Sequence, residues 1–269
     1  MTQKDILEIG NITRGRIHRQ TVFADFLGMS ACIISNSLDP VHYEQRTASL
    51  EVLLRNYHPE EKARLSESLK ALMKQIQGNV ELGRFEDLLG PAFMELRMGS
   101  KGQDFTPRDN CALTARLTAP GFQTLPDCGY FTLDEPACGV CGMVLAVAEQ
   151  IQNSGLNPTQ HLVVRAEDLD IRCVWMSYIQ LSLYGIPAVV IHGSTLSLEE
   201  IDRWYTPAYL LGNWVWREPM PFGDGKNRDN ELLKMAADPI YRAIRLMQGG
   251  VRNGKVYPSR ANDGSADSS

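Results

Sequence analysis

An acidic pair followed by a glycine-containing turn is the segment of this sequence best suited to binding a ligand. It runs from Phe131 to Met143 and reads Phe-Thr-Leu-Asp-Glu-Pro-Ala-Cys-Gly-Val-Cys-Gly-Met. Glu135, at the end of a predicted strand, can accept hydrogen bonds from an ammonium or hydroxyl group. Gly139 and Gly142 let the backbone approach a ligand closely, and the helix that follows offers free N–H groups. A purely structural tight turn uses the same residues, so this segment alone does not decide between the two.

The elements around the turn predict a parallel α/β sheet. Three short apolar segments have the composition of buried strands, and the two segments between them have helical spacing. In order they are a strand at 128–133, a helix at 139–152, a strand at 161–165, a helix at 170–183 and a strand at 188–192. This alternation is typical of a Rossmann-like sheet, in which ligands bind at the carboxyl ends of the strands. We also expect a fourth strand at 209–216 and a helix at 231–247.

The first hundred residues predict helices. Residues 22–34 are apolar and rich in small side chains, and residues 59–77 and 84–98 repeat apolar positions every three or four residues. We expect Gly78 to end the second of these helices. The predicted organisation is a helical region over 1–100, an α/β domain over 101–248 and a disordered tail over 249–269.

Composition excludes several classes of protein. The chain has 269 residues, of which 43% are hydrophobic and 22% charged, so it is not wholly disordered, collagen-like or coiled-coil. It has no apolar run that could span a membrane and no apolar leader, so we expect a cytoplasmic protein. The net charge of −5 is no signature of nucleic-acid binding. Cys138 and Cys141 have no second pair at zinc-site spacing, so we expect no metal, while a redox dithiol stays open.

Three ordered blocks resemble the methylation subunit of type I restriction-modification systems, a family of adenine-N6 DNA methyltransferases. The turn from Glu135 to Val144 is similar to the family's S-adenosylmethionine turn, Asp-Pro-Ala-Cys-Gly-Ser-Gly-Gly-Met-Leu. Upstream, residues 87–90 and 102–108 (Gly-Gln-Asp-Phe-Thr-Pro-Arg) resemble the family's Gly-x-x-Phe/Tyr-Thr-Pro-Arg region. Downstream, residues 166–196 resemble its second and third strands. The resemblance covers roughly residues 80–196.

The resemblance implies a class I methyltransferase fold, S-adenosylmethionine as cofactor and DNA as substrate. It also implies a restriction-modification or other protein subunit as partner, and it is compatible with an oligomer. The cofactor-binding residues that it implies are Phe105, Thr106, Glu135, Pro136, Gly139, Gly142 and Glu167. Glu167, at the end of the second strand, would bind the ribose hydroxyls, as strand-end carboxylates do in such sheets. Two alternatives stay open: Phe105 as a core aromatic, and Glu167 as an acid that stabilises a helix N-terminus.

The sequence departs from the family pattern at the turn and after it. Cys141 replaces a glycine where a positive φ is expected, so we expect a narrowed or lost pocket, and Val140 replaces a serine. The family's catalytic Asn/Asp-Pro-Pro-aromatic tetrapeptide, which contacts the flipped base, is absent. The nearest catalytic candidates are Asn213, Trp214 and Trp216, alternatively a strand with buried indoles.

Two further observations bear on the missing tetrapeptide. Asp238-Pro239-Ile240-Tyr241 is explained as a helix start, with aspartate as N-cap and proline in the first turn. The length that follows Leu196 predicts a sheet that is truncated or completed unconventionally.

Three functions remain open from the sequence. The first is an S-adenosylmethionine-dependent adenine-N6 DNA methyltransferase that acts with partners. The second, favoured by the missing tetrapeptide, is a catalytically inactive methyltransferase-like protein that binds cofactor, DNA or a restriction-modification subunit as a regulator or decoy. The third is methylation of another small or protein substrate, because fold does not fix function.

Overall fold

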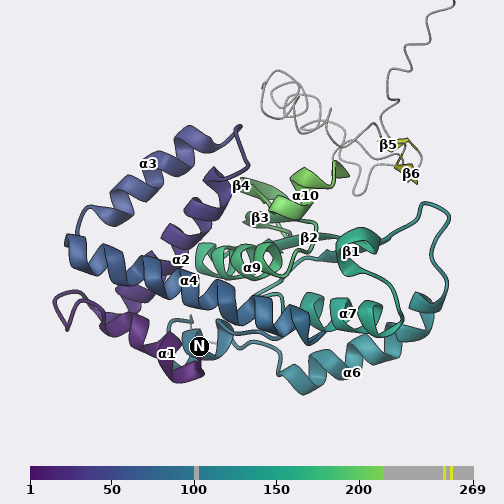
Figure 1. Cartoon of the computed structure of the whole chain (residues 1–269), viewed down its shortest axis with the longest axis horizontal. Helices are drawn as coiled ribbons and strands as arrows, with labels where there is room; N and C mark the ends of the chain where they lie inside the picture. Colours follow the sequence, from purple (N-terminus) through teal and green to yellow (C-terminus); the bar gives the residue numbers. More distant parts are fainter. Residues whose placement is uncertain (100–102, 215–250, 253–254, 257–269) are drawn as a thin grey trace, which may run out of the picture.

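The computed structural model describes residues 1–99, 103–214, 251–252 and 255–256 (Figure 1). The helix expected at 231–247, with its Asp238-Pro239 start, lies outside the described residues, as do Trp216 and most of the tail expected at 249–269. Within that tail, β5 (Val251–Arg252) and β6 (Lys255–Val256) form a short antiparallel pair.

The described residues contain helices on both sides of one main sheet. The α-helices are α1 (Gln3–Glu8), α2 (Arg19–Asn36), α3 (Tyr43–Leu54), α4 (Pro59–Glu81), α5 (Gly90–Glu95), α6 (Arg108–Thr118), α7 (Gly142–Asn153), α8 (Pro158–His161), α9 (Ile171–Leu183) and α10 (Pro207–Leu211). The strands of the main sheet are β1 (Phe131–Glu135), β2 (Leu162–Asp168), β3 (Ala188–Ser194) and β4 (Glu199–Tyr205). Two 3-10 turns, η1 (Ile9–Asn11) and η2 (Ala119–Gln123), lie between helices. No helix in this described part is long and apolar enough to cross a membrane.

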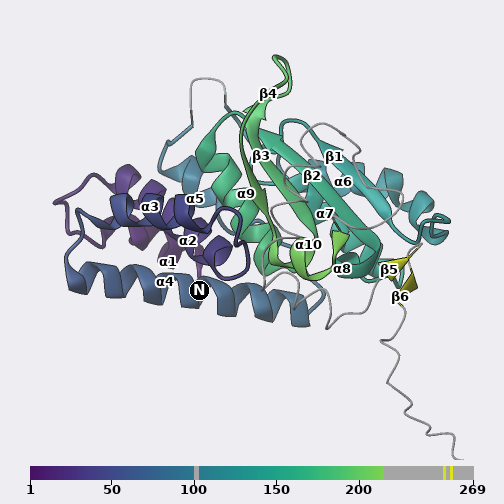
Figure 2. The ribbon, with the colours of Figure 1, turned by 90° about the horizontal axis from the view of Figure 1, so that it is seen from above.

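The sheet confirms the predicted parallel α/β arrangement. Strands β1, β2 and β3 lie side by side in that order and run parallel, and β4 pairs antiparallel with β3 (Figure 2). Helices α7 and α8 lead from β1 to β2, and α9 leads from β2 to β3. Glu135 is in register with Ala166, and Asp168 with His192. The carboxyl ends of the three parallel strands therefore meet at one edge.

The fourth strand lies earlier in the chain than expected, so the strand predicted at 209–216 is wrong. Thr206 begins helix α10 there, because its Oγ1 accepts a hydrogen bond from the N–H of Tyr209 and Pro207 occupies the first turn. The actual strand, β4, has the sequence Glu-Glu-Ile-Asp-Arg-Trp-Tyr. Its charged residues suit an edge strand but hide the apolar alternation by which a strand is predicted.

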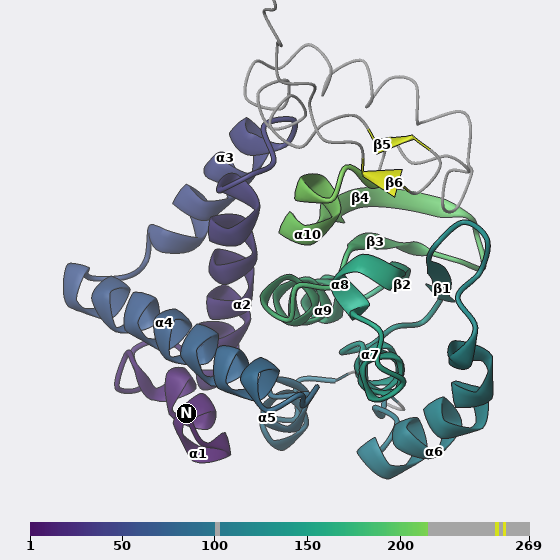
Figure 3. The same cartoon turned by 45° about the vertical axis from the view of Figure 1, so that its right-hand side comes forward.

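Helices cover the two faces of the sheet unequally (Figure 3). Helices α7 and α9 lie on one face, and α2 of the N-terminal region packs against α9. Buried side chains from the N-terminal helices and from the α/β part form one continuous hydrophobic core. On the opposite face, α10 and Trp214 cover a smaller cluster that includes Tyr130 and Tyr205.

The N-terminal helices agree with the sequence in part. Helix α2 confirms the buried helix expected at 22–34, but α4 continues through Gly78 to Glu81. A single glycine in a helix interior costs only about 1 kcal/mol, which the buried face of α4 offsets. The glycine that ends α4 is Gly83, whose φ is +68°. The N–H of Arg84 then donates to the carbonyl of Asn79 across the helix end.

The helix expected at 84–98 is reduced to α5 (Gly90–Glu95). Asp87 ends the preceding non-helical segment by accepting hydrogen bonds from the N–H groups of Leu89 and Gly90, at 3.1 and 2.8 Å. The N–H of Leu88 donates to Oε1 of Gln180 on α9, at 2.8 Å. These side-chain acceptors replace the carbonyls that a helix would supply, which is why the apolar spacing did not produce one.

A buried arginine joins α3 to β4. The guanidinium of Arg46 donates to both carboxylate oxygens of Asp202, at 2.5 and 2.9 Å, and to the carbonyl of Arg203, at 2.7 Å. It also lies 3.5 Å from the ring centre of Trp204. These partners offset the cost of removing the charge from water.

We expect Asp202→Ala to lower the free energy of unfolding by about 3 kcal/mol, because it leaves the buried Arg46 without its carboxylate. Urea denaturation followed by circular dichroism measures this loss. Glu67→Ala, which removes the exposed pair between Glu67 and Lys70, is the control and should cost at most about 0.5 kcal/mol. Equal losses in the two variants would contradict a structural role for the buried pair.

Candidate functional site

The turn between β1 and α7 is held by hydrogen bonds from two neighbouring elements. The N–H of Cys138 donates to the carbonyl of Glu167 on β2 at 2.9 Å. From α9, Ser177 Oγ donates to the carbonyl of Gly139 at 2.8 Å. Backbone groups that are withdrawn from water need such partners, so β2 and α9 together fix the shape of the turn.

Two residues of the turn have left-handed backbone. Gly139 has a φ of +52° and Cys141 a φ of +60°. A Cβ atom at position 139 would also lie 3.1 Å from Cδ1 of Phe105. Glycine is therefore favoured at position 139 both by the positive φ and by the ring that lies against it.

A cavity of about 510 Å³ opens beside this turn, next to α6 and α7, at the carboxyl end of β1. The structure brings five of the predicted cofactor-binding residues to its wall, namely Phe105, Thr106, Glu135, Gly139 and Gly142. Its volume is in the range of small-molecule sites. Five of the seven predicted site residues, from two separate sequence blocks, thus meet around one cavity.

Pro136 and Glu167 do not line this cavity. They line a second one, of about 320 Å³, together with Asp134 and Arg165. Successive residues of a strand point to opposite faces of the sheet, so Glu167 faces away from the first cavity and the next residue, Asp168, lines it. The Glu167 carboxylate is 8% exposed and lies 3.7 Å from the Arg165 guanidinium.

Asp168 is a site residue that the sequence analysis missed. Its Oδ2 accepts a hydrogen bond from the N–H of Gly139 at 2.9 Å, and its Oδ1 accepts one from the N–H of Asp170 at 2.8 Å. It therefore ties the end of β2 to the turn that follows β1. The two-residue period of β2 distinguishes it from Glu167 only when the register of the strand is known.

Carboxylates dominate the wall of the 510 Å³ cavity. They are Asp87, Asp104, Glu135, Glu149 and Asp168. Among the described lining residues, Arg108 is the only cation. This excess of negative charge favours a ligand that carries positive charge. No cluster of His, Cys, Asp and Glu in the described part of the chain could hold a metal ion.

Burial raises the pKa values of three of these carboxyl groups above their ordinary values. Desolvation is the largest cause for Asp87, Glu135 and Asp168. The neighbouring charge of Asp134 raises the pKa of Glu135 further. Backbone N–H donors, such as that of Gly139 to Asp168, act in the opposite direction. A positively charged ligand would stabilise the ionised form of all three groups.

Cys141 does not narrow the cavity, which corrects the expectation from the sequence. Its φ is positive, as expected where the family has a glycine, but its side chain is fully buried in the hydrophobic core and does not line the cavity. Val140 does line it. A hydrogen bond with Cys141, together with burial, raises the pKa of the Cys138 thiol well above its usual value. Cys138 and Cys141 are only 7% and 0% exposed, and this poor access to both sulfur atoms argues against the redox alternative.

Of the three catalytic candidates, the structure describes Asn213 and Trp214, and it brings neither to this cavity. Trp214 is fully buried on the opposite face of the sheet, edge-on to Tyr130 with ring centres 5.0 Å apart. Asn213 is 3% exposed and has a φ of +53°. Both residues lie in the turn that follows α10. The alternative expectation of a strand with buried indoles is therefore right about the burial of Trp214 but wrong about the strand. In this conformation Trp214 has no exposed face for a base.

Comparison with known proteins finds similarity to solved structures alone. No family model and no curated protein matches the chain. A solved protein from Listeria monocytogenes, described as a candidate class I S-adenosylmethionine-dependent methyltransferase, is similar with 14% identity and a TM-score of 0.40. The match covers 71% of this chain and 51% of that protein, so the chain spans about half the length of its structural neighbour.

The left-handed conformation of Cys141 yields a stability prediction. We expect Cys141→Gly to be more stable than Cys141→Ala by about 1 kcal/mol, because only alanine has a Cβ at a positive φ. At Cys138, which has no positive φ, the order should reverse. Urea denaturation of the four variants measures both differences. Alanine more stable than glycine at both positions would show that the turn is not left-handed in solution.

Proposed function

We propose that this chain binds S-adenosylmethionine in the 510 Å³ cavity beside the β1–α7 turn and belongs functionally to the S-adenosylmethionine-dependent methyltransferases. The observation that carries this proposal is that five carboxylates line a cavity beside a left-handed, glycine-containing turn at the carboxyl ends of β1 and β2. It is supported by the sequence resemblance, which had already selected five of the lining residues.

The chemistry of the wall fits the cofactor. S-adenosylmethionine carries a sulfonium and an ammonium group, a carboxylate, a ribose diol and an adenine ring. The acidic wall suits the two cationic groups, and Asp168 at the end of β2 suits the diol. Arg108 suits the carboxylate, and Phe105 offers an apolar surface. When bound, the cofactor supplies an activated methyl group.

We propose adenine N6 of DNA as the methyl acceptor, with a partner protein in the cytoplasm. The choice of acceptor is supported by the resemblance to the type I methylation subunit. The need for a partner is supported by the absence of the catalytic tetrapeptide from this sequence. Because Trp214 is buried and Asn213 lies beside it, the group that orients the target amine is proposed to come from a restriction-modification or other subunit.

A second candidate function is supported by the same absence. A chain that binds the cofactor and lacks the tetrapeptide would act as a regulator or decoy without methyl transfer. Transfer of a tritiated methyl group to adenine-containing DNA separates the two candidates. Incorporation that depends on an added methylation-complex partner supports the first. Cofactor binding without incorporation in any mixture supports the second.

We expect Asp168→Asn to weaken S-adenosylmethionine binding by about tenfold, because it removes a carboxylate from the cavity and keeps the side chain's shape. Isothermal titration of the purified chain measures this. Glu167→Gln is the matched control, one residue away on the other face of the sheet, and should bind as the unmodified chain does. Loss of binding in the Glu167 variant alone would contradict the assignment of the cavity.

Cofactor affinity should also fall as the pH is lowered from neutral through the raised pKa values of the cavity carboxyl groups. Burial raises the pKa of Glu135 and Asp168, so these groups take up protons at a higher pH than exposed carboxyl groups do and lose their attraction for a cation. In the ligand-free chain the same protonation raises the free energy of unfolding, because a carboxyl group whose pKa is raised by folding binds protons more tightly in the folded state than in the unfolded state. Titrations at several pH values measure the affinity, and thermal denaturation at each pH is the control. An affinity that does not change over this range would contradict the proposal.

A further inference from the structure

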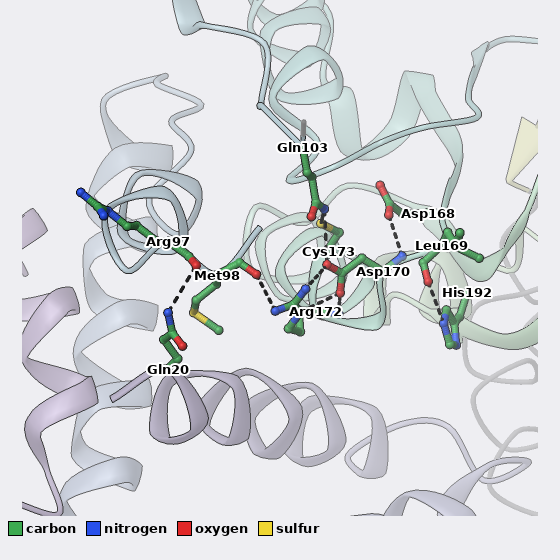
Figure 4. Close-up of polar contacts among 10 residues, drawn as sticks. All are labelled: Gln20, Arg97, Met98, Gln103, Asp168, Leu169, Asp170, Arg172, Cys173 and His192. Carbon is green, nitrogen blue, oxygen red and sulfur yellow. Dashed lines mark hydrogen bonds and ion pairs between the residues drawn. The ribbon is translucent and has the colours of Figure 1, made fainter. Parts of the chain in front are cut away.

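Arg172, near the start of α9, contacts two parts of the chain that are far apart in sequence (Figure 4). Its Nε and Nη2 donate to the two carboxylate oxygens of Asp170, at 2.8 and 2.6 Å. Its Nη1 donates to the carbonyl of Met98, just after α5, at 2.6 Å. The guanidinium carbon also lies 5.2 Å from the ring centre of Phe93. All three donor nitrogens of the fork are therefore engaged, two by a carboxylate and one by a backbone carbonyl.

Asp170 connects this arginine to the cavity wall. Its own N–H donates to Asp168 Oδ1 at 2.8 Å, and Asp168 Oδ2 in turn accepts from the N–H of Gly139. The Oδ2 atom of Asp170, which accepts from Arg172 Nη2, also accepts a hydrogen bond from Nε2 of Gln103 at 3.3 Å. Gln103 directly precedes the Asp104-Phe105-Thr106 segment that lines the cavity. Asp170 thus connects two walls of the cavity by hydrogen bonds, one wall carrying Asp168 and the other Phe105.

The Met98 end of this contact is itself fixed to the N-terminal region. Gln20 Nε2, on α2, donates to the carbonyl of Leu96 at 2.7 Å and lies 3.3 Å from that of Arg97. Arg172 therefore lies between the segment after α5, which is hydrogen-bonded to α2, and the loop after β2. Figure 4 shows these side chains in a row, from Gln20 through Arg172 to Asp168.

We propose that Arg172 is a positioning residue of the cavity. Anchored on the carbonyl of Met98, it fixes Asp170, which binds Asp168 on one wall and Gln103, next to the Asp104–Thr106 segment, on the other, and so sets the spacing of the two walls. The ligand's identity rests on the function proposed above, whereas the spacing of the walls does not. Charge-assisted hydrogen bonds of this kind are stronger than neutral ones, and Asp170 would lose its ion-pair partner if the arginine were removed.

The first measurement is S-adenosylmethionine binding to Arg172→Gln and Arg172→Lys by isothermal titration. We expect about tenfold weaker binding for glutamine and a smaller loss for lysine, which restores the charge without the fork. The matched control is Arg16→Gln. Arg16 likewise pairs with a carboxylate, Glu61, and donates to a backbone carbonyl, that of Asn56 at 2.9 Å, but it lies outside the cavity.

The second measurement needs no ligand. Cys111 lines the cavity, is 2% exposed, and its Sγ lies 3.6 Å from the carbonyl of Thr106. If the wall that carries Thr106 moves away, alkylation of Cys111 by iodoacetamide becomes faster. Cys32, buried in α2, reports global unfolding. Peptide mass spectrometry then gives the ratio of the Cys111 rate to the Cys32 rate in each variant. A purely structural role for Arg172 would raise both rates together and leave their ratio unchanged.

The outcomes separate the positioning role from the proposed ligand. A raised Cys111 to Cys32 ratio in Arg172→Gln, partly restored in Arg172→Lys and unchanged in Arg16→Gln, supports positioning. The same ratio change in a chain that does not bind S-adenosylmethionine at all supports positioning and overturns the proposed function. An unchanged ratio in Arg172→Gln overturns the positioning role, whatever the titrations show.

Discussion

The site depends on one constraint, which is that a buried turn in left-handed conformation must have its backbone groups hydrogen-bonded by its neighbours. Ser177 and Gln180 of α9 supply two of these bonds, to the carbonyls of Gly139 and Val140. The Gln180 amide also accepts the N–H of Leu88, so one side chain fixes both the turn and the segment that carries Asp87. The cavity wall therefore takes its shape from a helix that lies behind it.

This arrangement explains why charge can gather in the cavity. Five carboxylates line it, and burial raises the pKa of three. Hydrogen bonds from backbone N–H groups offset part of the cost of burying these charges. Asp168 accepts two, from Gly139 and Asp170, and Asp87 accepts two, from Leu89 and Gly90. Fixed donors of this kind stabilise the ionised carboxyl groups of the acidic wall.

The sequence predicted what depends on local pattern. The strands of the parallel sheet and the buried helix α2 follow from apolar spacing, and five cavity residues follow from the resemblance. It failed where tertiary contacts decide. Residues 84–89 have helical spacing, but the N–H groups of Leu88 and Leu89 donate to the side chains of Gln180 and Asp87. Strand β4 can carry charged residues because it is the outermost strand of the described sheet and because its Asp202 forms an ion pair with Arg46 of α3.

The choice between Glu167 and Asp168 shows a second limit. Both are acids at the end of β2, and only the register of β2 with its neighbours decides which one faces the cavity. Cys141 shows the converse: the pattern gave its positive φ correctly, but the direction of its side chain depends on the packing of α7. Backbone demands are thus easier to predict from residue types than the side of the sheet on which a side chain lies.

The continuous core that joins α2 and α9 has a consequence for how this chain can vary. A genetic crossover that replaced the first hundred residues with those of a distant homologue would have to match the α2–α9 packing surface and the carbonyls that Gln20 and Arg172 bind. A homologous sequence would have to satisfy both requirements at once. Substitutions in the N-terminal helices are therefore constrained by the residues of the α/β part that they contact. The N-terminal helices are, in that sense, inherited together with the cavity that they support.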